Sequence, residues 1–177
     1  MPSPMPNLNV DPLNQLAEIQ KFLNRCHVFS GAPGGVSKLF AYLAIKEEFS
    51  KGELILEEGR CSDRFFLIMS GEVDIHQHYN GRRFHLQLLS DSTMNYFGEL
   101  ALLSEFNWFF SARALTDVKL LSVSREAFVK VMERHPGSYQ SMVQKIIKLR
   151  IDRFVDQSAY LLDHIAPDAW REYPLEK

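Results

Sequence analysis

The sequence predicts an α+β fold, with helices on either side of a mainly antiparallel sandwich or roll of short strands. Apolar residues recur at helical spacing before residue 49 and again after residue 124. Between these points, short runs of β-branched and aromatic residues alternate with turn residues. Of the 177 residues, 46% are hydrophobic and 24% are charged, as in an ordinary globular protein. This length suits one domain with its own core and some flanking helix.

Two helices are predicted within residues 11–48, after a loose, proline-rich arm formed by residues 1–10. Asp11 is a suitable N-cap and Pro12 a suitable first helical residue. A second helix covers roughly residues 36–46. The intervening SGAPGG lacks the Gly-Lys-Ser/Thr ending of a phosphate loop, which favours an ordinary turn.

The strands are predicted within residues 49–123. The apolar runs GELIL, RFFLIM, EVDIH and FHLQLL are separated by turn-forming stretches. Asn80-Gly81 is the strongest hairpin signal, because both residue types accept the positive φ of a tight two-residue turn. Another strand pair, SARAL and KLLSV, is joined at Thr116-Asp117.

Helices return in residues 124–166, and residues 167–177 form a tail. The segment REAFVKVMERH ends before Pro136-Gly137, and Ser138 is the expected cap of a long final helix. The apolar stripe of this helix comprises Met142, Val143, Ile146, Ile147, Ile151, Phe154, Val155, Leu161, Leu162 and Ile165. Its basic residues are interpreted as a solvated face: Lys145, Lys148, Arg150 and Arg153.

Composition and motifs exclude several function classes. The 20 basic and 22 acidic residues give a formal charge of −2, which argues against a surface built to grip nucleic acid. Two cysteines make no disulfide framework, so a cytoplasmic setting is expected. No signal peptide and no membrane-spanning run is recognised. We find no G-x-S-x-G, H-E-x-x-H or Cys-x-x-Cys motif and no DNA-reading module, so neither an enzyme nor a nucleic-acid-binding protein is expected.

The order of five motifs resembles the cyclic-nucleotide-binding domain, the regulatory β-roll of catabolite-activator-type transcription factors, cyclic-nucleotide-dependent kinases and nucleotide-gated channels. These motifs are KGE (51–53), EEG (57–59), FFLIMSGEV (65–73), NGRR (80–83) and FGELALL (97–103). The resemblance covers roughly residues 28–150 and places glycines at the family's turns. It implies an antiparallel β-roll (a double-stranded β-helix or jelly roll) with flanking helices. It also implies a regulatory function with cAMP or cGMP as ligand.

Phe97-Gly98-Glu99 opens a short helix after a strand, where backbone N–H groups and the helix dipole favour an anion. Gly98 allows a ligand to approach the backbone closely. The resemblance implies that Glu99 accepts a hydrogen bond from a ribose hydroxyl, and the alternative is an acid that only stabilises the first helical turn. The candidate ligand-binding residues are Gly98, Glu99, Leu100, Ala101, Trp108, Phe109, Ser111 and Arg113.

The family's phosphate-binding arginine is missing. Trp108 stands at its position, and Phe109 and Phe110 stand where the family carries small residues. No Lys or Arg lies between Arg83 and Arg113, and Arg113 is expected to reach the pocket from the side or to make a cross-strand pair. Loss of a buried charged partner costs about 2–5 kcal/mol, so cAMP and cGMP are expected to bind weakly or not at all. The run FNWFF is then a plug or part of the core, a partner surface, or an apolar ligand pocket.

Three histidines fall on one face of the predicted hairpin. His76 lies opposite His85, and His78 shares their face, which suits a zinc-like ion. The alternative is a solvated polar face, with the core on the other side at Val73, Ile75, Leu86 and Leu88. Haem-binding relatives of the family exist, but no clear Cys-His signature stands in this sequence.

The leading hypothesis is a regulatory module that acts by binding another protein or itself through the C-terminal helix. The second is a working sensor of a cyclic nucleotide or related small ligand with an altered pocket. The third is a metal- or haem-dependent sensor.

Overall fold

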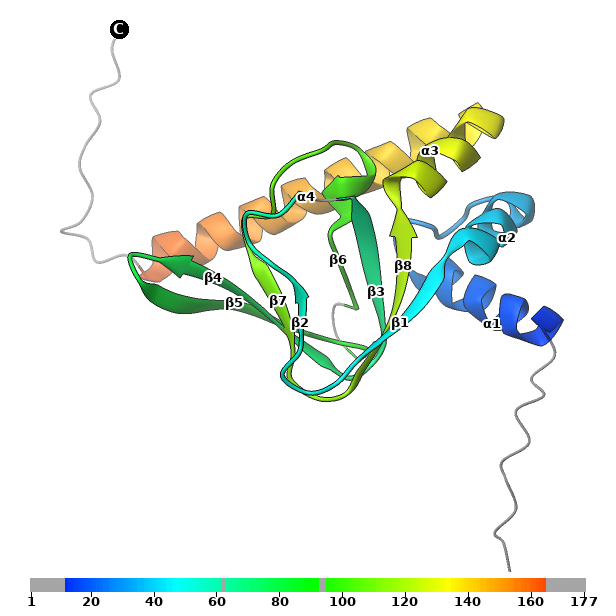
Figure 1. Cartoon of the computed structure of the whole chain (residues 1–177). Coiled ribbons are helices and arrows are strands. Elements are labelled where there is room, and N and C mark those ends of the chain that lie inside the picture. The colour runs from blue at the N-terminus through cyan, green and yellow to red at the C-terminus, as the bar shows by residue number, and fades with distance from the viewer. Residues whose placement is uncertain (1–11, 62, 93–94, 165–177) are drawn as a thin grey trace, which may run out of the picture.

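In the described part of the chain, two four-stranded antiparallel sheets form a roll, and four α-helices cover one side and one flank of it (Figure 1). This is a computed structural model, and it describes residues 12–61, 63–92 and 95–164. The predicted β-roll with flanking helices is confirmed. The long last helix crosses the roll from the other helices to the tip of the β4–β5 hairpin (Figure 1).

The described elements follow in chain order. They are α1 (Pro12–Arg25), α2 (Gly34–Leu43), β1 (Ile45–Phe49), β2 (Leu54–Leu56), β3 (Arg64–Ser70), β4 (Glu72–Tyr79), β5 (Arg82–Ser90), β6 (Tyr96–Phe97), the 3-10 helix η1 (Glu99–Leu102), β7 (Ser111–Ala114), β8 (Val118–Ser124), α3 (Arg125–Arg134) and α4 (Pro136–His164). The first sheet has the order β1-β8-β3-β6 and the second β2-β7-β4-β5.

Hydrophobic side chains gather in two clusters. One lies between the first sheet and the helices and includes Phe29, Phe40, Phe65 and Phe128, all at most 1% exposed. The other belongs to the interior of the roll and includes Ile68, Val73, Leu120, Trp108 and Phe110. The helices therefore bury one face of the first sheet, and the roll closes around a core of its own.

The second predicted helix ends earlier than expected. It stops at Leu43, and Ile45–Phe49 form strand β1, which pairs along its length with β8. The stretch IKEEF has a composition that favours helix, so the prediction to residue 46 was wrong there. Pairing with β8 outweighs this weak local preference, since propensities differ by only about 0.5 kcal/mol per residue.

The Asn80-Gly81 hairpin is confirmed. Both residues have positive φ, at 49° and 73°, and Tyr79 pairs with Arg82. The register then shifts, because His76 pairs with His85 while Ile75 pairs with Gln87. Leu86 is the extra residue of this β-bulge, so the residues beyond it change face. The predicted core side was therefore wrong for Leu86 and Leu88, which are 50% and 46% exposed, and Leu89 is the buried leucine instead.

Ser124 caps α3, because its hydroxyl accepts a hydrogen bond from the Ala127 N–H at 3.1 Å. Helix α4 begins at Pro136 rather than at the predicted Ser138 cap, since proline suits the first turn of a helix. The described part of the chain contains no helix that is both long and apolar enough to cross a membrane. The predicted ends of α4, at Ile165 and Pro167, lie outside the described residues.

The predicted apolar stripe of α4 occupies two different faces. Met142 and Ile146 are at most 2% exposed and pack into the helical core cluster. Five further apolar residues of the helix lie in the open: Ile147, Ile151, Phe154, Val155 and Leu162, at 48 to 69% exposed. One face of α4 therefore anchors it to the domain, and another presents apolar side chains to the surroundings.

Candidate functional site

A cavity of about 90 Å³ lies where η1, the β4–β5 hairpin, the aromatic run FNWFF and α4 meet. The predicted candidates Gly98, Glu99, Leu100, Trp108 and Phe109 all line it. It is also lined by residues outside the predicted set: Ile75, Leu86, Gln87, Leu89, Phe97, Phe106, Phe110, Arg150, Arg153 and Gln157. The cavity thus has an aromatic and aliphatic wall from the roll and a polar wall from α4.

Trp108 packs directly on Gly98. A Cβ at Gly98 would lie 2.9 Å from Trp108 Cη2 and 2.8 Å from the Arg64 carbonyl oxygen, and the residue has φ of 81°. Only glycine is tolerated at such a position. The indole therefore lies against the backbone of Gly98, where a ligand was expected to bind.

The aromatic run divides between core and surface. Trp108 and Phe110 are 5% and 9% exposed and their ring centroids lie 5.4 Å apart. Phe106 packs edge-on against Trp108 at 5.2 Å, which places three rings in one cluster. Phe109 is 46% exposed and forms part of the cavity rim. The interpretation of the run as core or plug therefore fits Trp108 and Phe110, and Phe109 is the surface member.

Glu99 is 2% exposed and faces two arginines of α4. Its Oε1 lies 3.4 Å from Arg150 Nη1 and 3.2 Å from Arg153 Nη1. The Arg153 guanidinium also lies 5.2 Å from the ring centroid of Tyr96. Burial raises the pKa of Tyr96 to about 12, so the phenol stays neutral at pH 7. These contacts tie η1 to the second half of α4.

The basic residues of α4 are not simply a solvated face, and that prediction was wrong for three of them. Arg150 and Arg153 line the cavity, and Lys145 Nζ donates to the Ser30 carbonyl oxygen. Lys148 is exposed and pairs with Asp152 at 3.0 Å, as expected of a surface residue. A sequence signal for the arginines exists in hindsight, since Ile146, Arg150, Arg153 and Gln157 follow one another at steps of three and four.

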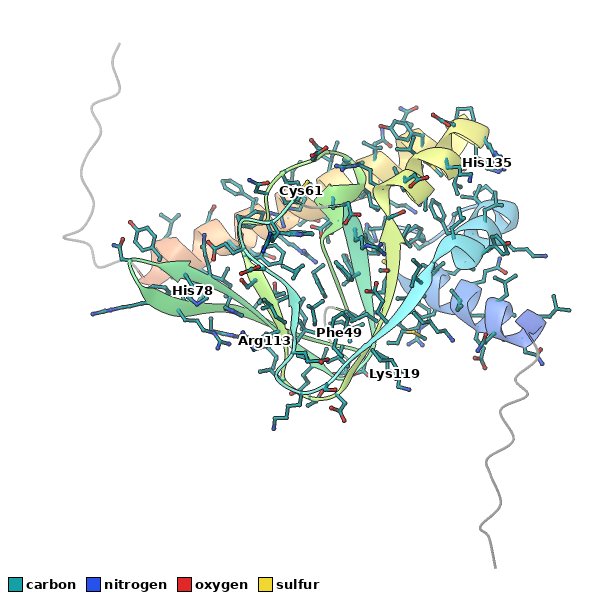
Figure 2. All side chains as sticks on the ribbon, in the orientation of Figure 1. Phe49, Cys61, His78, Arg113, Lys119 and His135 are labelled. Carbon is teal, nitrogen blue, oxygen red and sulfur yellow. The ribbon has the colours of Figure 1, made fainter. Side chains whose placement is uncertain are left out.

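Three predicted ligand residues lie outside the cavity. Ala101 is buried in the core of the roll. Ser111 Oγ accepts a hydrogen bond from the Glu58 N–H at 3.0 Å. Arg113, labelled on β7 in Figure 2, donates to the Gly52 carbonyl oxygen. The period of two that places Ser111 and Arg113 on one face of β7 turns both away from the interior, which Ala112 and Ala114 face.

Each of the three histidines lies near an acid, and the rings of His76 and His78 also meet edge-on at 5.5 Å. His76 Nδ1 lies 3.0 Å from Asp74 Oδ2, and His85 Nδ1 and Arg83 also contact this carboxylate. His78, toward the tip of the hairpin in Figure 2, lies 3.8 Å from Glu58. Within residues 12–61, 63–92 and 95–164, no group of three or more His, Cys, Asp or Glu side chains could hold a metal ion. The arrangement therefore gives the metal hypothesis no support.

Burial distinguishes His76 from the other two. Its side chain is 2% exposed, against 58% for His78 and 60% for His85, so the expectation of three solvated histidines was wrong for His76. Burial and the nearby Arg83 lower its pKa, so the imidazole is neutral at pH 7. Burial alone would raise the pKa of Asp74, but hydrogen bonds from His85 and Arg83 lower it overall, so this carboxylate is ionised.

Comparison with known proteins places this chain in one family. A sequence profile of the cyclic nucleotide-binding domain matches residues 46–135, just over half of the chain. The chain therefore belongs to the cyclic nucleotide-binding domain family, and the resemblance drawn from the sequence motifs is confirmed.

Its relatives are named as regulators. A CRP-like cAMP-activated global transcriptional regulator from Mycobacterium tuberculosis is 27% identical over 146 residues, covering 81% of this chain and 63% of that protein. A cAMP-dependent protein kinase regulatory subunit from Emericella nidulans is 34% identical over 85 residues, covering 48% of this chain and 20% of that protein. The N-terminal domain of a Streptomyces coelicolor transcriptional regulator superposes with a TM-score of 0.66 at 22% identity, covering 76% of this chain and 92% of that one. The chain thus spans less than two thirds of the length of the Mycobacterium tuberculosis and Emericella nidulans proteins.

Proposed function

We propose that the chain is a regulatory module of the cyclic nucleotide-binding fold that has weak or no affinity for cAMP and cGMP and acts by binding protein. The observation that carries this proposal is the indole of Trp108 seated on Gly98. The resemblance puts a phosphate-binding arginine at position 108, and here that position supplies an apolar, 5% exposed ring instead. A ligand would have to displace a core side chain before it could reach the backbone of η1.

The volume of the cavity supports the same conclusion. Pockets for ligands of ordinary drug size occupy about 300–1,000 Å³. The cavity here measures about 90 Å³, too little for a nucleotide without rearrangement. The acid that the resemblance assigns to the ribose is already engaged, because Glu99 contacts Arg150 and Arg153.

Calorimetric titration with cAMP and cGMP tests the proposal. The unmodified protein is expected to bind neither with a Kd below about 1 mM, a free energy of about −4 kcal/mol. The double variant Trp108→Arg/Phe109→Ser, which restores a cation and space while leaving the buried Phe110 in place, is expected to gain about tenfold or more. Trp108→Leu, which gives space without charge, is the matched control and is expected to gain less. Micromolar binding by the unmodified chain would contradict the proposal.

A second candidate function is a sensor of a small ligand with an altered pocket. It is favoured by Arg150 and Arg153, which bring two guanidiniums to the cavity from α4 although the segment around Trp108 has none. In this alternative the charge that recognises the ligand comes from the helix rather than from the roll.

The exposed apolar face of α4 is the proposed contact surface, with a second copy of the chain as its first partner. Phe154 and Ile151 are 69% and 56% exposed, which is costly for a surface with no partner. Phe154→Asp is expected to convert dimers to monomers in light scattering. Its folded state should lose at most about 0.5 kcal/mol, because the side chain is not in the core.

Ser141→Asp is the control for added charge on the same helix and is expected to leave association unchanged, since Ser141 is exposed and outside the apolar face. A monomeric unmodified protein at high concentration would rule out self-association and leave a different protein as the partner. An unfolded Phe154→Asp variant would show instead that the face is core.

A further inference from the structure

The cavity below α4 carries one more positive than negative charge. Arg150 and Arg153 line it from the helix, Glu99 lines it from η1, and the remaining lining residues are uncharged. Both guanidiniums contact the same carboxylate oxygen, Glu99 Oε1. The charged residues that line the cavity therefore sum to one net positive charge, which favours an anionic ligand.

Arg150 is the better placed of the two arginines to bind a ligand. Its side chain is 31% exposed, against 14% for Arg153, whose guanidinium also lies over Tyr96. An arginine carries five N–H donors in a planar fork that matches a carboxylate with two parallel hydrogen bonds. Arg150 contacts Glu99 through Nη1 and also lines the cavity.

Apolar side chains also line the cavity. Trp108, Phe109 and Leu86 line it, and Phe109 and Leu86 are 46% and 50% exposed. A short hydrocarbon group laid against these side chains would remove that apolar surface from water, at about 25 cal/mol per Å². The cavity is therefore lined by cationic side chains of α4 and by apolar side chains of the roll.

Its size limits the ligand. The cavity measures about 90 Å³, less than the roughly 150 Å³ of an engineered apolar cavity that binds benzene. A molecule of a few heavy atoms fits, with its outer end at the open rim beside Phe109. A dianionic phosphate would exceed the single surplus charge and has no apolar part for the aromatic wall.

We propose that this cavity binds a small monocarboxylate, with its carboxylate on Arg150 and its short apolar chain against Trp108, Phe109 and Leu86. This inference rests on the proposed function, because it requires that no cyclic nucleotide occupies the cavity. Arg150 belongs to α4, so the ligand stabilises the arrangement in which α4 lies over the cavity. Binding of such an acid would therefore influence the helix that carries the proposed contact surface.

Thermal unfolding at constant ionic strength tests the proposal, with sodium acetate, propionate and butyrate compared with chloride and inorganic phosphate. At least one monocarboxylate is expected to raise Tm saturably and to shift the indole N–H signal of Trp108 in NMR spectra. Arg150→Gln is expected to weaken that binding about tenfold or more, because a charge-assisted hydrogen bond is lost. Lys148→Gln is the matched control, because Lys148 lies on the exposed side of the same helix and outside the cavity.

The proposal is overturned if no monocarboxylate raises Tm beyond chloride at tens of millimolar, if phosphate binds as tightly, or if Arg150→Gln binds as well as the unmodified chain. Cyclic nucleotides titrated in the same assay separate the two proposals. Micromolar binding of cAMP or cGMP contradicts the proposed function whatever the carboxylates do. If neither class of ligand binds, only the carboxylate site fails.

Discussion

Replacing Trp108 with alanine is expected to lower the free energy of unfolding by about 3–5 kcal/mol, the usual cost of truncating a buried aromatic side chain. The indole is 5% exposed and packs against Phe106, Phe110 and Gly98. It also lines a second hollow of about 340 Å³ beside Cys61, so its removal would join the two spaces. Urea unfolding followed by circular dichroism measures the loss.

Phe109→Ala is the matched control, because Phe109 is an aromatic neighbour that is 46% exposed. It is expected to cost less than about 1.5 kcal/mol. Amides of α4 within residues 147–160 should exchange faster in Trp108→Ala than in Phe109→Ala, if the indole supplies contacts that a ligand supplies elsewhere. Equal costs and equal exchange in the two variants would show that Trp108 is not an internal plug.

Replacing Glu99 with glutamine is expected to destabilise the fold by about 2–4 kcal/mol, because it leaves two arginines facing each other without a carboxylate. This range is below the usual 3–5 kcal/mol for breaking a buried pair, since solvent screens the partly exposed Arg150. Glutamine keeps the shape of the side chain, so packing is little changed. Denaturant unfolding gives the total cost, and hydrogen exchange shows whether residues 150–164 are released.

A double-mutant cycle separates the ion pair from other effects of the substitution. Glu99→Gln and Arg153→Gln are expected to show a coupling energy of about 1–3 kcal/mol, because the two side chains are in contact and largely buried. Lys148→Gln in place of Arg153→Gln is the control and should couple with Glu99→Gln by less than about 0.5 kcal/mol. If Glu99→Gln costs no more than a surface substitution, the ion pairs of Glu99 do not hold α4 to η1.

Local patterns predicted the roll well because its strands depend on short-range signals. The apolar runs from GELIL to KLLSV became β2 to β5, β7 and β8, and the hairpin formed at Asn80-Gly81. Gly98 was predicted to permit a close backbone approach, and it does, with Trp108 as the approaching group. The need for glycine at a position and the formation of a tight turn depend on a few consecutive residues. Both can therefore be predicted from a single sequence.

The errors fall where distant segments outweigh local preference. The composition of IKEEF favours helix, but pairing with β8 makes it β1. The bulge at Leu86 reverses which leucines of β5 are buried, and no residue pattern in FHLQLL predicts this bulge. Register in a sheet is decided by the partner strand and the core, because one inserted residue turns every later side chain to the other face.

By itself, the sequence determined the family and the fold, and it led to the expectation that Trp108 stands at the position of the family's arginine. The tertiary structure decided what surrounds Glu99. Arg150 and Arg153 lie 51 and 54 positions after Glu99 in the chain. Helical spacing alone does not say which face of α4 is covered. Met142 and Ile146 anchor one face to the core, and this rotation of the helix turns the two arginines toward η1. The charge that is absent from the segment around Trp108 is therefore present in the cavity, because packing of an apolar face oriented the polar residues beside it.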